Sequence, residues 1–244
     1  SVERAGATRA VEPTPADCEY GGKAWNDAVP RVYTEFFSGQ REGLFVDIGA
    51  GDGVFQSVTH FFQSHLCWTG ILVEPTPNEY MKLVKQRPGA VTVNAAVCSM
   101  DGERTDFLDV TKDGLWTGWS GFDETFTADH SVQVQDALYS GAGWQTQYLK
   151  VRCLTLSTLL ATYGITFVDV LRVSVEGHEL QALSSLDFGR VHVNVVLVET
   201  GGDAQTGIEH LLKGHGFRRL HEPGSSHAER GNVMFVHRDL GTGA

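Results

Sequence analysis

Short apolar runs and amphipathic stretches alternate along most of the chain, a pattern typical of strands followed by helices. Runs typical of buried strands occupy residues 44–48, 71–73, 90–97, 168–173 and 192–198. Helical spacing of apolar residues occurs over residues 54–67, 77–86, 155–163, 180–186 and 208–212. This order predicts an α/β fold with a mostly parallel sheet and helices on both faces. Residues 217–221 and 232–237 add an antiparallel terminal strand pair, which completes a seven-stranded sheet.

The pattern also suggests where the domain begins. Residues 1–22 contain proline and glycine with little periodicity and predict an N-terminal arm. Residues 23–244 then form a single domain. Within it, residues 24–37 carry apolar residues at helical spacing, which predicts a helix that packs on the sheet edge or covers the ligand site.

Periodicity fails between residues 111 and 150, where aromatic residues accumulate among glycines and polar residues. These aromatics are Trp116, Trp119, Phe122, Phe126, Tyr139, Trp144 and Tyr148. We expect an irregular, aromatic-rich insertion, and so many aromatics argue against disorder. The segment suits a cover over the substrate, and it suits an accessory hydrophobic cluster or an oligomer contact equally well.

Composition narrows the classes of partner. The chain has 30 acidic and 19 basic residues, a formal net charge of −11, and no cluster of lysine and arginine. This disfavours binding to nucleic acid or to an anionic membrane. No apolar run approaches the roughly 18 to 20 residues that span a bilayer. We therefore expect a soluble domain. Because the chain starts at Ser1 rather than Met, its location stays open between the cytoplasm and the lumenal part of a longer secretory-pathway protein.

Four widely spaced cysteines, Cys18, Cys67, Cys98 and Cys153, form no C-x-x-C motif. Neither a zinc site nor a redox pair is therefore indicated. Because the last three lie in apolar surroundings, buried free thiols are predicted in preference to two disulfides. The sequence carries no signal for the oligomeric state.

Candidate chemistry begins where the first strand runs into the glycine turn Asp47-Ile48-Gly49-Ala50-Gly51-Asp52-Gly53. Glycine permits positive φ angles and a close approach of the backbone to a ligand, although such a turn is also a common structural feature. The spacing G-x-G-x-G differs from the dinucleotide fingerprint G-x-G-x-x-G, which disfavours a pyrophosphate ligand and an NAD-dependent oxidoreductase. Glu74, at the end of the next strand, stands about 20 residues beyond the glycines, where a carboxylate receives ribose hydroxyls. Together these residues predict a nucleoside site.

Other polar residues follow the later strands. Ligands of such sheets bind beyond the carboxyl ends of the strands, so residues 174–178 and Glu199 should converge with Asp47 and Glu74. Asn94 and its neighbouring small residues suit an opening for an adenine ring, with a plain strand end as the alternative.

Four segments together resemble the FkbM-type methyltransferases. They are residues 45–53, residues 68–75, residues 94–97 with Asp101-Gly102, and residues 169–179. The resemblance covers roughly residues 43–110 and 151–200. It implies a Rossmann-like class I methyltransferase fold, S-adenosylmethionine as cofactor, and a hydroxyl of a sugar, glycan or small natural product as acceptor.

The resemblance also assigns cofactor residues, motif by motif. The methionine end of the cofactor would meet Asp47, Gly49, Ala50, Gly51 and Gly53. The ribose would meet Glu74 with Pro75, and the adenine would border Asn94 and Ala95.

One position departs from the family pattern. Where the family has an acid, this chain has Ser174, followed by Val175, Glu176 and Gly177. A serine is neither a carboxylate base nor a strong ligand for a divalent metal, so no metal is predicted. Ser174 would border the transferred methyl group. Its presence also favours the rival hypothesis, a catalytically degenerate domain that binds a partner.

Methyl transfer to a hydroxyl is an in-line displacement, and the hydroxyl proton needs an acceptor. The candidates are Glu176, His178 and Glu199, which follow the fourth and fifth strands. Capping of the next helix is the alternative role for Glu176, and a plain surface position is the alternative for His178.

Overall fold

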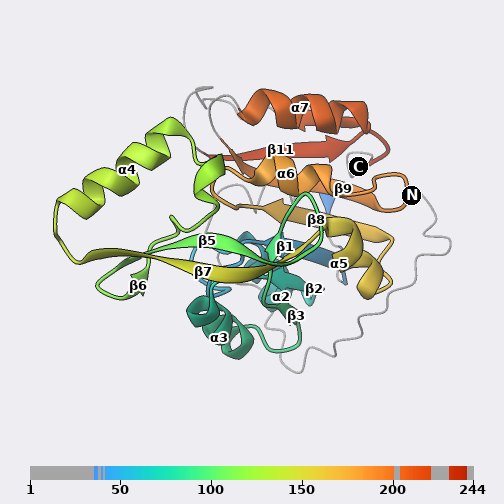
Figure 1. Cartoon of the computed structure of the whole chain (residues 1–244). Helices are drawn as coiled ribbons and strands as arrows, with labels where there is room; N and C mark the ends of the chain where they lie inside the picture. Colours follow the sequence, from blue (N-terminus) through green and yellow to red (C-terminus); the bar gives the residue numbers. More distant parts are fainter. Residues whose placement is uncertain (1–35, 38–39, 41, 201–203, 221–230, 241–244) are drawn as a thin grey trace.

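The structure is a computed structural model (Figure 1). It describes residues 36–37, 40, 42–200, 204–220 and 231–240. The predicted arm, residues 1–22, lies outside the described residues. So does the helix predicted over residues 24–37, apart from its last two residues.

A seven-stranded sheet forms the centre of the molecule, in the order β10-β11-β9-β8-β1-β2-β3. Its strands are β1 (Leu44–Ile48), β2 (Thr69–Val73), β3 (Val91–Val93), β8 (Phe167–Val173), β9 (His192–Thr200), β10 (Phe217–Leu220) and β11 (Gly231–His237). All neighbouring pairs are parallel except the two that contain β11, which runs antiparallel to β9 and β10. The predicted sheet and its antiparallel terminal strands are confirmed.

Helices cover both faces of this sheet, as predicted. They are α2 (Val58–Leu66), α3 (Pro77–Gln86), α5 (Leu156–Thr162), α6 (Glu179–Ser184) and α7 (Ala204–Gly214). Alternate residues of β1 enter different cores: Val46 packs with α5, α6 and α7, whereas Phe45 packs with α2 and α3. Burial on both faces explains why the central strands are continuous apolar runs. None of the described helices is long and apolar enough to cross a membrane.

Helix α2 begins later than the sequence pattern indicates. The Asp52 carboxylate accepts hydrogen bonds from the backbone N–H groups of Val54 (2.9 Å) and Phe55 (2.8 Å), which keeps these residues in a turn. Ser57 then caps the helix by accepting from the N–H of His60. Phe55, which a helix over residues 54–67 would place on its inward face, is therefore 61% exposed.

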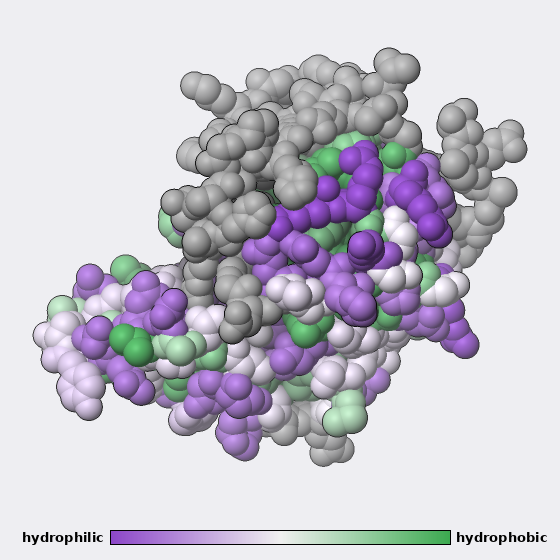
Figure 2. Space-filling view, turned by 90° about the horizontal axis from the view of Figure 1, so that it is seen from above, coloured by the Kyte–Doolittle hydropathy of each residue, from purple (hydrophilic) through white to green (hydrophobic). Residues whose placement is uncertain are grey.

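The segment predicted to be irregular instead contributes part of a second sheet, in the order β4-β7-β5-β6. Its strands are β4 (Ala96–Val97), β5 (Gly102–Lys112), β6 (Leu115–Trp116) and β7 (Trp144–Leu154), with the 3-10 helix η1 (Asp123–Thr125) and helix α4 (Ala128–Tyr139) between β6 and β7. The long pair β5 and β7 projects from the central sheet, with α4 beside its outer end (Figure 1). Seen from above, this projection carries isolated apolar residues among hydrophilic ones (Figure 2).

The strand predicted over residues 90–97 is two strands in two sheets. β3 pairs with β2, whereas β4 pairs with β7. Asn94 lies at the break, and its side-chain amide donates to the carbonyls of Glu74 (2.9 Å) and Pro75 (3.1 Å). The break carries the chain from the central sheet into the second one.

The prediction of free thiols is wrong. Cys98 and Cys153 form a disulfide across 55 residues of chain, and Cys67 is also disulfide-bonded. The register of β4 and β7 places Val97 opposite Leu154, which brings the two neighbouring cysteines together. Because that pairing belongs to the unpredicted second sheet, apolar surroundings alone could not distinguish a buried thiol from a bridge.

Candidate functional site

A cavity of about 250 Å³ opens at the carboxyl ends of β1, β2, β8 and β9. One wall comes from the central sheet and its turns, and the other from the second sheet. Seven of the predicted site residues line the cavity from the side of the central sheet: Gly49, Ala50, Glu74, Pro75, Ala95, Ser174 and Glu199. Glu176 lines it as well. The expected convergence of the strand ends is therefore seen for most of the predicted residues.

The glycine turn brings the backbone to the cavity. Gly49 has a φ of 79°, and a Cβ there would lie 1.9 Å from the carbonyl oxygen of Ser174. Only glycine allows the turn to pack so closely on the loop after β8. Gly51 and Gly53 do not line the cavity. The N–H of Gly51 donates to Glu74, and Gly53 packs against Leu83 of α3.

Glu74 is buried at the end of β2, with its side chain in the cavity wall. One oxygen, Oε2, accepts from the N–H of Gly51 (2.8 Å), and Oε1 accepts from the N–H (2.9 Å) and hydroxyl (2.6 Å) of Thr76. Burial raises the pKa of the Glu74 carboxyl to about 7, because desolvation outweighs these hydrogen bonds.

Asp47 lies behind the cavity wall rather than in it. Its carboxylate is fully buried, accepts from the Thr59 hydroxyl (2.6 Å), and pairs with Nη1 of Arg172 (3.0 Å). Arg172 does line the cavity, and the same Nη1 donates to the carbonyl of Gly49 (3.2 Å). Asp47 therefore acts on the site through Arg172. The sequence reading missed Arg172, although a charged residue inside the apolar run of β8 was a usable signal.

Ser174 holds a carboxylate instead of supplying one. Its hydroxyl donates to Oε2 of Glu199 (2.6 Å), which also lies 3.8 Å from Nη2 of Arg172. Glu199 lines the cavity from the end of β9, beside Ser174, where the family motif has an acid. The departure at Ser174 therefore leaves a carboxylate in the site.

Glu176 lies in the tight loop after β8, with a φ of 50°. Its Oε2 is 3.3 Å from Nδ1 of His130, a fully buried residue of α4. Nε2 of His130 lies 3.1 Å from the carbonyl oxygen of Trp119. No local sequence pattern connects His130 with Glu176, since their contact depends on the unpredicted position of α4.

Two further predicted residues, His178 and Asn94, do not line the cavity either. His178 is buried against the ring of Phe122, with 4.6 Å between ring centroids, and neither ring nitrogen has a hydrogen-bond partner among the described residues. Desolvation lowers the pKa of His178 to about 4. His178 is thus neither on the surface nor placed to take a proton from a bound acceptor. Asn94 supports the cavity from behind, through residues 74–75.

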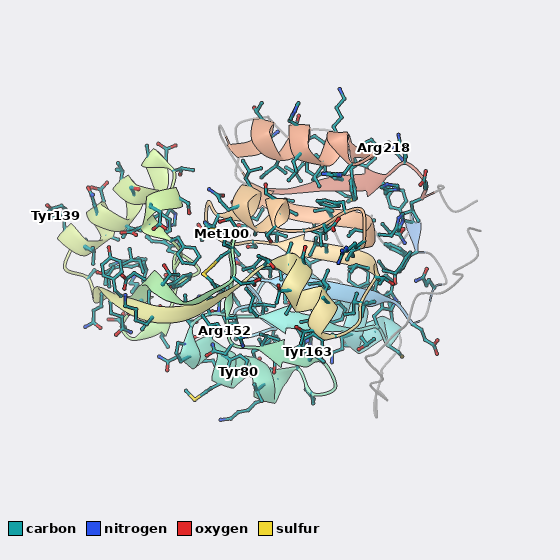
Figure 3. The ribbon with its side chains drawn as sticks, turned by 45° about the vertical axis from the view of Figure 1, so that its right-hand side comes forward. Tyr80, Met100, Tyr139, Arg152, Tyr163 and Arg218 are labelled. Carbon is teal, nitrogen blue, oxygen red and sulfur yellow. A yellow bond between two sulfur atoms is a disulfide. The ribbon has the colours of Figure 1, made fainter. Side chains whose placement is uncertain are left out.

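Aromatic side chains form the second wall. Trp116, Trp119 and Phe122 line the cavity, and Trp119 stacks on Trp144 with 4.6 Å between ring centroids. Across from them, Phe55 meets Trp116 edge to face. This placement puts part of the aromatic segment against the cavity, and its role as a cover over the substrate stays a prediction. Tyr139, by contrast, is 88% exposed and points outward from the end of α4 (Figure 3).

The sequence profile described as the methyltransferase FkbM domain matches residues 47–219. The chain belongs to the FkbM methyltransferase family. Family membership confirms the resemblance, the class I Rossmann-like fold and S-adenosylmethionine as the cofactor of this methyltransferase. A search of curated protein sequences finds no relative of the chain.

Solved structures resemble this FkbM methyltransferase in fold at low sequence identity. A precorrin-6y C5,15-methyltransferase from Geobacter metallireducens is 11% identical (TM-score 0.43), with 90% of this chain and 93% of that chain covered. An FkbM methyltransferase from Methylobacillus flagellatus is 10% identical (TM-score 0.42), with 84% of this chain and 48% of that chain covered. TYW2 from M. jannaschii, in complex with AdoMet, is 11% identical (TM-score 0.39), with 88% of this chain and 77% of that chain covered.

The donor set of this FkbM methyltransferase fits its cofactor. A buried carboxyl group that lines a cavity suits the hydroxyl donors of a ribose, and small residues such as Ala95 and Ala96 leave room for a flat ring. Among the described residues, no group of three or more His, Cys, Asp or Glu side chains is arranged to hold a metal ion.

Proposed function

We propose that this FkbM methyltransferase transfers a methyl group to a hydroxyl of a sugar, a glycan or a small natural product. The observation that carries this proposal is the pair of carboxylates, Glu176 and Glu199, that line the same cavity as the cofactor residues. An alcohol needs its proton removed as it is methylated, and a positioned carboxylate can accept that proton.

The cofactor residues divide into those that touch S-adenosylmethionine and those that support them. Glu74 and Pro75 would meet the ribose, and Ala95 the adenine. Gly49 and Ala50 would present the backbone of the turn to the methionine end. Asp47, Gly51, Gly53 and Asn94 would hold these groups in place through the contacts described above. When bound, S-adenosylmethionine supplies an electrophilic methyl group on a sulfonium.

The acceptor would enter between the carboxylates and the aromatic wall. Trp116, Trp119 and Phe122 offer flat apolar surfaces, while Glu176 and Glu199 offer hydrogen-bond acceptors for hydroxyls. Such a wall excludes water and orients the acceptor oxygen, and orientation alone can contribute about 7 to 11 kcal/mol to an in-line displacement. General-base help adds about 10² to 10⁴ fold.

The second candidate function is a catalytically degenerate domain that binds a partner, which the serine at position 174 favours. Its hydrogen bond to Glu199 speaks against degeneracy, because the carboxylate is retained in the wall. Turnover on an acceptor decides between the two functions.

For the cellular location, we infer an oxidising compartment. Disulfides persist in secreted and lumenal proteins and are rare in the cytosol. The Cys98–Cys153 bond and the bonded state of Cys67 therefore favour the lumenal alternative over the cytoplasmic one.

Calorimetric titration of the full chain with S-adenosylmethionine and with S-adenosylhomocysteine tests the cofactor site, with NAD as the control ligand and EDTA present. Binding of the first two and not of NAD is expected. Transfer of a labelled methyl group to a panel of hexoses, 6-deoxyhexoses, pentoses and small alcohols then tests the acceptor class. Binding of the cofactor with no transfer to any member of the panel would favour the partner-binding domain.

A further inference from the structure

The His130–Glu176 contact joins two parts of the molecule that lie far apart in sequence. His130 belongs to α4 of the projecting segment, and Glu176 to the loop after β8 in the central sheet. His130 is fully buried, and the ring of Phe126 meets it edge to face with 4.2 Å between ring centroids. Its backbone N–H donates to the Thr127 hydroxyl that caps α4. Helix and aromatic packing therefore fix the ring beside Glu176.

The hydrogen-bond partners determine where the protons lie. A backbone carbonyl only accepts hydrogen bonds, so Nε2 of His130 must carry a proton to bond the carbonyl of Trp119. Nδ1 then faces Oε2 of Glu176 at 3.3 Å. A bare Nδ1 opposite an ionised carboxylate would set two acceptors against each other. A further proton on either group removes this repulsion.

We propose that His130 is a positioning residue that orients Glu176 as the proton acceptor of methyl transfer. This inference rests on the proposed function of the site. The acceptor oxygen bonds to the methyl carbon as the carbon–sulfur bond breaks, and the electron pair of that bond goes to sulfur. The hydroxyl proton passes to Glu176. The positive charge lost from the sulfonium thus appears on the Glu176–His130 pair, which returns a proton to solvent.

Glu176 suits this role better than Glu199 does. Glu199 accepts the Ser174 hydroxyl at 2.6 Å and lies 3.8 Å from the Arg172 guanidinium, so its Oε2 is already engaged. The Glu176 side chain is also the more buried of the two, with 15% exposed against 40% for Glu199. Burial favours uptake of a proton by a carboxylate.

Kinetics of three single variants and one double variant test the proposal on an acceptor from the monosaccharide panel. His130→Gln keeps a donor near the Nε2 position and removes the group that faces Glu176. His130→Asn instead places an amide donor near the Nδ1 position. We expect about a 10²-fold loss of kcat in His130→Gln and in Glu176→Gln, and partial recovery in His130→Asn. KM and the affinity for S-adenosylmethionine should change less than about 2-fold, because orientation of a base is not ground-state binding.

The double variant separates positioning from a structural role. If His130 acts through Glu176, combining His130→Gln with Glu176→Gln should cost no more than Glu176→Gln alone, because residues that act as a unit are not additive. Additive losses would overturn the proposal. The matched control is His210→Gln, the same substitution at an exposed residue of α7, which should retain wild-type turnover.

Nitrogen-15 NMR of the full chain, labelled at the histidine rings, tests the proton arrangement without any acceptor. The His130 signals are assigned by their loss in His130→Gln. Nε2 should carry a proton, and the Nδ1 signal should move toward that of a bare ring nitrogen in Glu176→Gln. A bare Nε2, or an Nδ1 signal unchanged by Glu176→Gln, would overturn the proposal. Lack of cofactor binding or turnover in the wild type would instead defeat the proposed function.

Discussion

At the residue scale, the charged groups of the cavity fall into two sets that share Arg172. On the cofactor side, Asp47 and the Gly49 carbonyl both accept from its Nη1. On the acceptor side, Nη2 approaches Glu199. A buried pair such as Asp47 with Arg172 is weak evidence for stability, because desolvation offsets the attraction. Its clearer effect is geometric, since it fixes the turn after β1 relative to Glu199.

Replacement of Glu74 by alanine should weaken the binding of S-adenosylmethionine strongly. Two ribose hydroxyls would lose a charged acceptor, at about 1.5 to 3 kcal/mol per hydrogen bond, or roughly 10-fold or more each. Calorimetric titration measures the loss. Glu124→Ala, which removes an exposed carboxylate from η1, is the control and should bind as the wild type does. Unchanged affinity in Glu74→Ala would show that the ribose lies elsewhere.

Binding of S-adenosylmethionine should strengthen as the pH rises from 6 to 8. Burial raises the pKa of Glu74 to about 7, so below that pH most of the carboxyl is protonated and offers fewer acceptors to the ribose. The affinity should rise by up to about 10-fold in total between pH 6 and pH 8, with most of the rise below the pKa. Titrations at several pH values check this, and Glu74→Gln should lose the dependence. An affinity independent of pH would contradict it.

The raised pKa of Glu74 also predicts how the free energy of unfolding of the cofactor-free chain changes with pH. Between the ordinary value of 4.5 and about 7, the folded state holds a proton on Glu74 that the unfolded state has lost. The Glu74 contribution to the free energy of unfolding should therefore decrease as the pH rises through this window. Urea unfolding of the wild type and of Glu74→Gln across the window measures the difference. The opposite slope would mean that the carboxyl is ionised when buried.

The sequence predicted Glu74, Glu176 and Glu199 because each lies at or just beyond the carboxyl end of a strand, and parallel strands bring such residues to one edge of the sheet. It misplaced His178, since two residues beyond Glu176 the chain has turned into α6 and the ring faces Phe122. His130 lay beyond reach for a different reason. Its contact with Glu176 arises from packing between segments that no local pattern connects.

At the element scale, the second sheet shows why some strands cannot be predicted from the sequence pattern. Residues 145–148 of β7 are exposed, so this part of the strand lacks the buried face that imposes an alternating pattern. The register of β5 and β7 is instead secured near its base, where Cys153 and Val151 are buried with Phe107 and Phe122. Because Phe122 also lines the cavity, loosening this base should disturb the aromatic wall.

Replacement of both Cys98 and Cys153 by serine should lower the free energy of unfolding by about 2 to 4 kcal/mol, since the bond closes a long loop of the unfolded chain. Urea unfolding with fluorescence detection measures the change, with a thiol count to verify that Cys67 remains bonded. Acceptor turnover should fall more than cofactor affinity, because the second sheet contributes the wall that we propose faces the acceptor. An equal loss of turnover and of cofactor affinity would show that the substitutions disturb the whole fold.

At the scale of the whole molecule, the cavity lies between the central sheet, which the sequence predicts, and the second sheet, which it does not predict. The central sheet is covered on both faces, so its strands are apolar throughout and could be read from the sequence. The second sheet follows from β4, which leaves the central sheet at Asn94. The predictable part of the fold thus holds the residues proposed to bind the cofactor, and the unpredicted part supplies the aromatic wall and His130.

The charge of the molecule argues against RNA as the acceptor. The net charge is −11, and two of the 19 basic residues, Arg87 and Arg172, are buried and unable to reach a phosphate backbone. Binding to RNA depends on lysine and arginine that replace the counterions of phosphates. We therefore expect no change in the anisotropy of a labelled RNA hairpin up to micromolar protein at low salt, and no methyl transfer to total tRNA. Binding that weakens steeply with added salt would instead reveal a basic surface on the folded chain, and it would remove the reason for preferring a neutral hydroxyl acceptor.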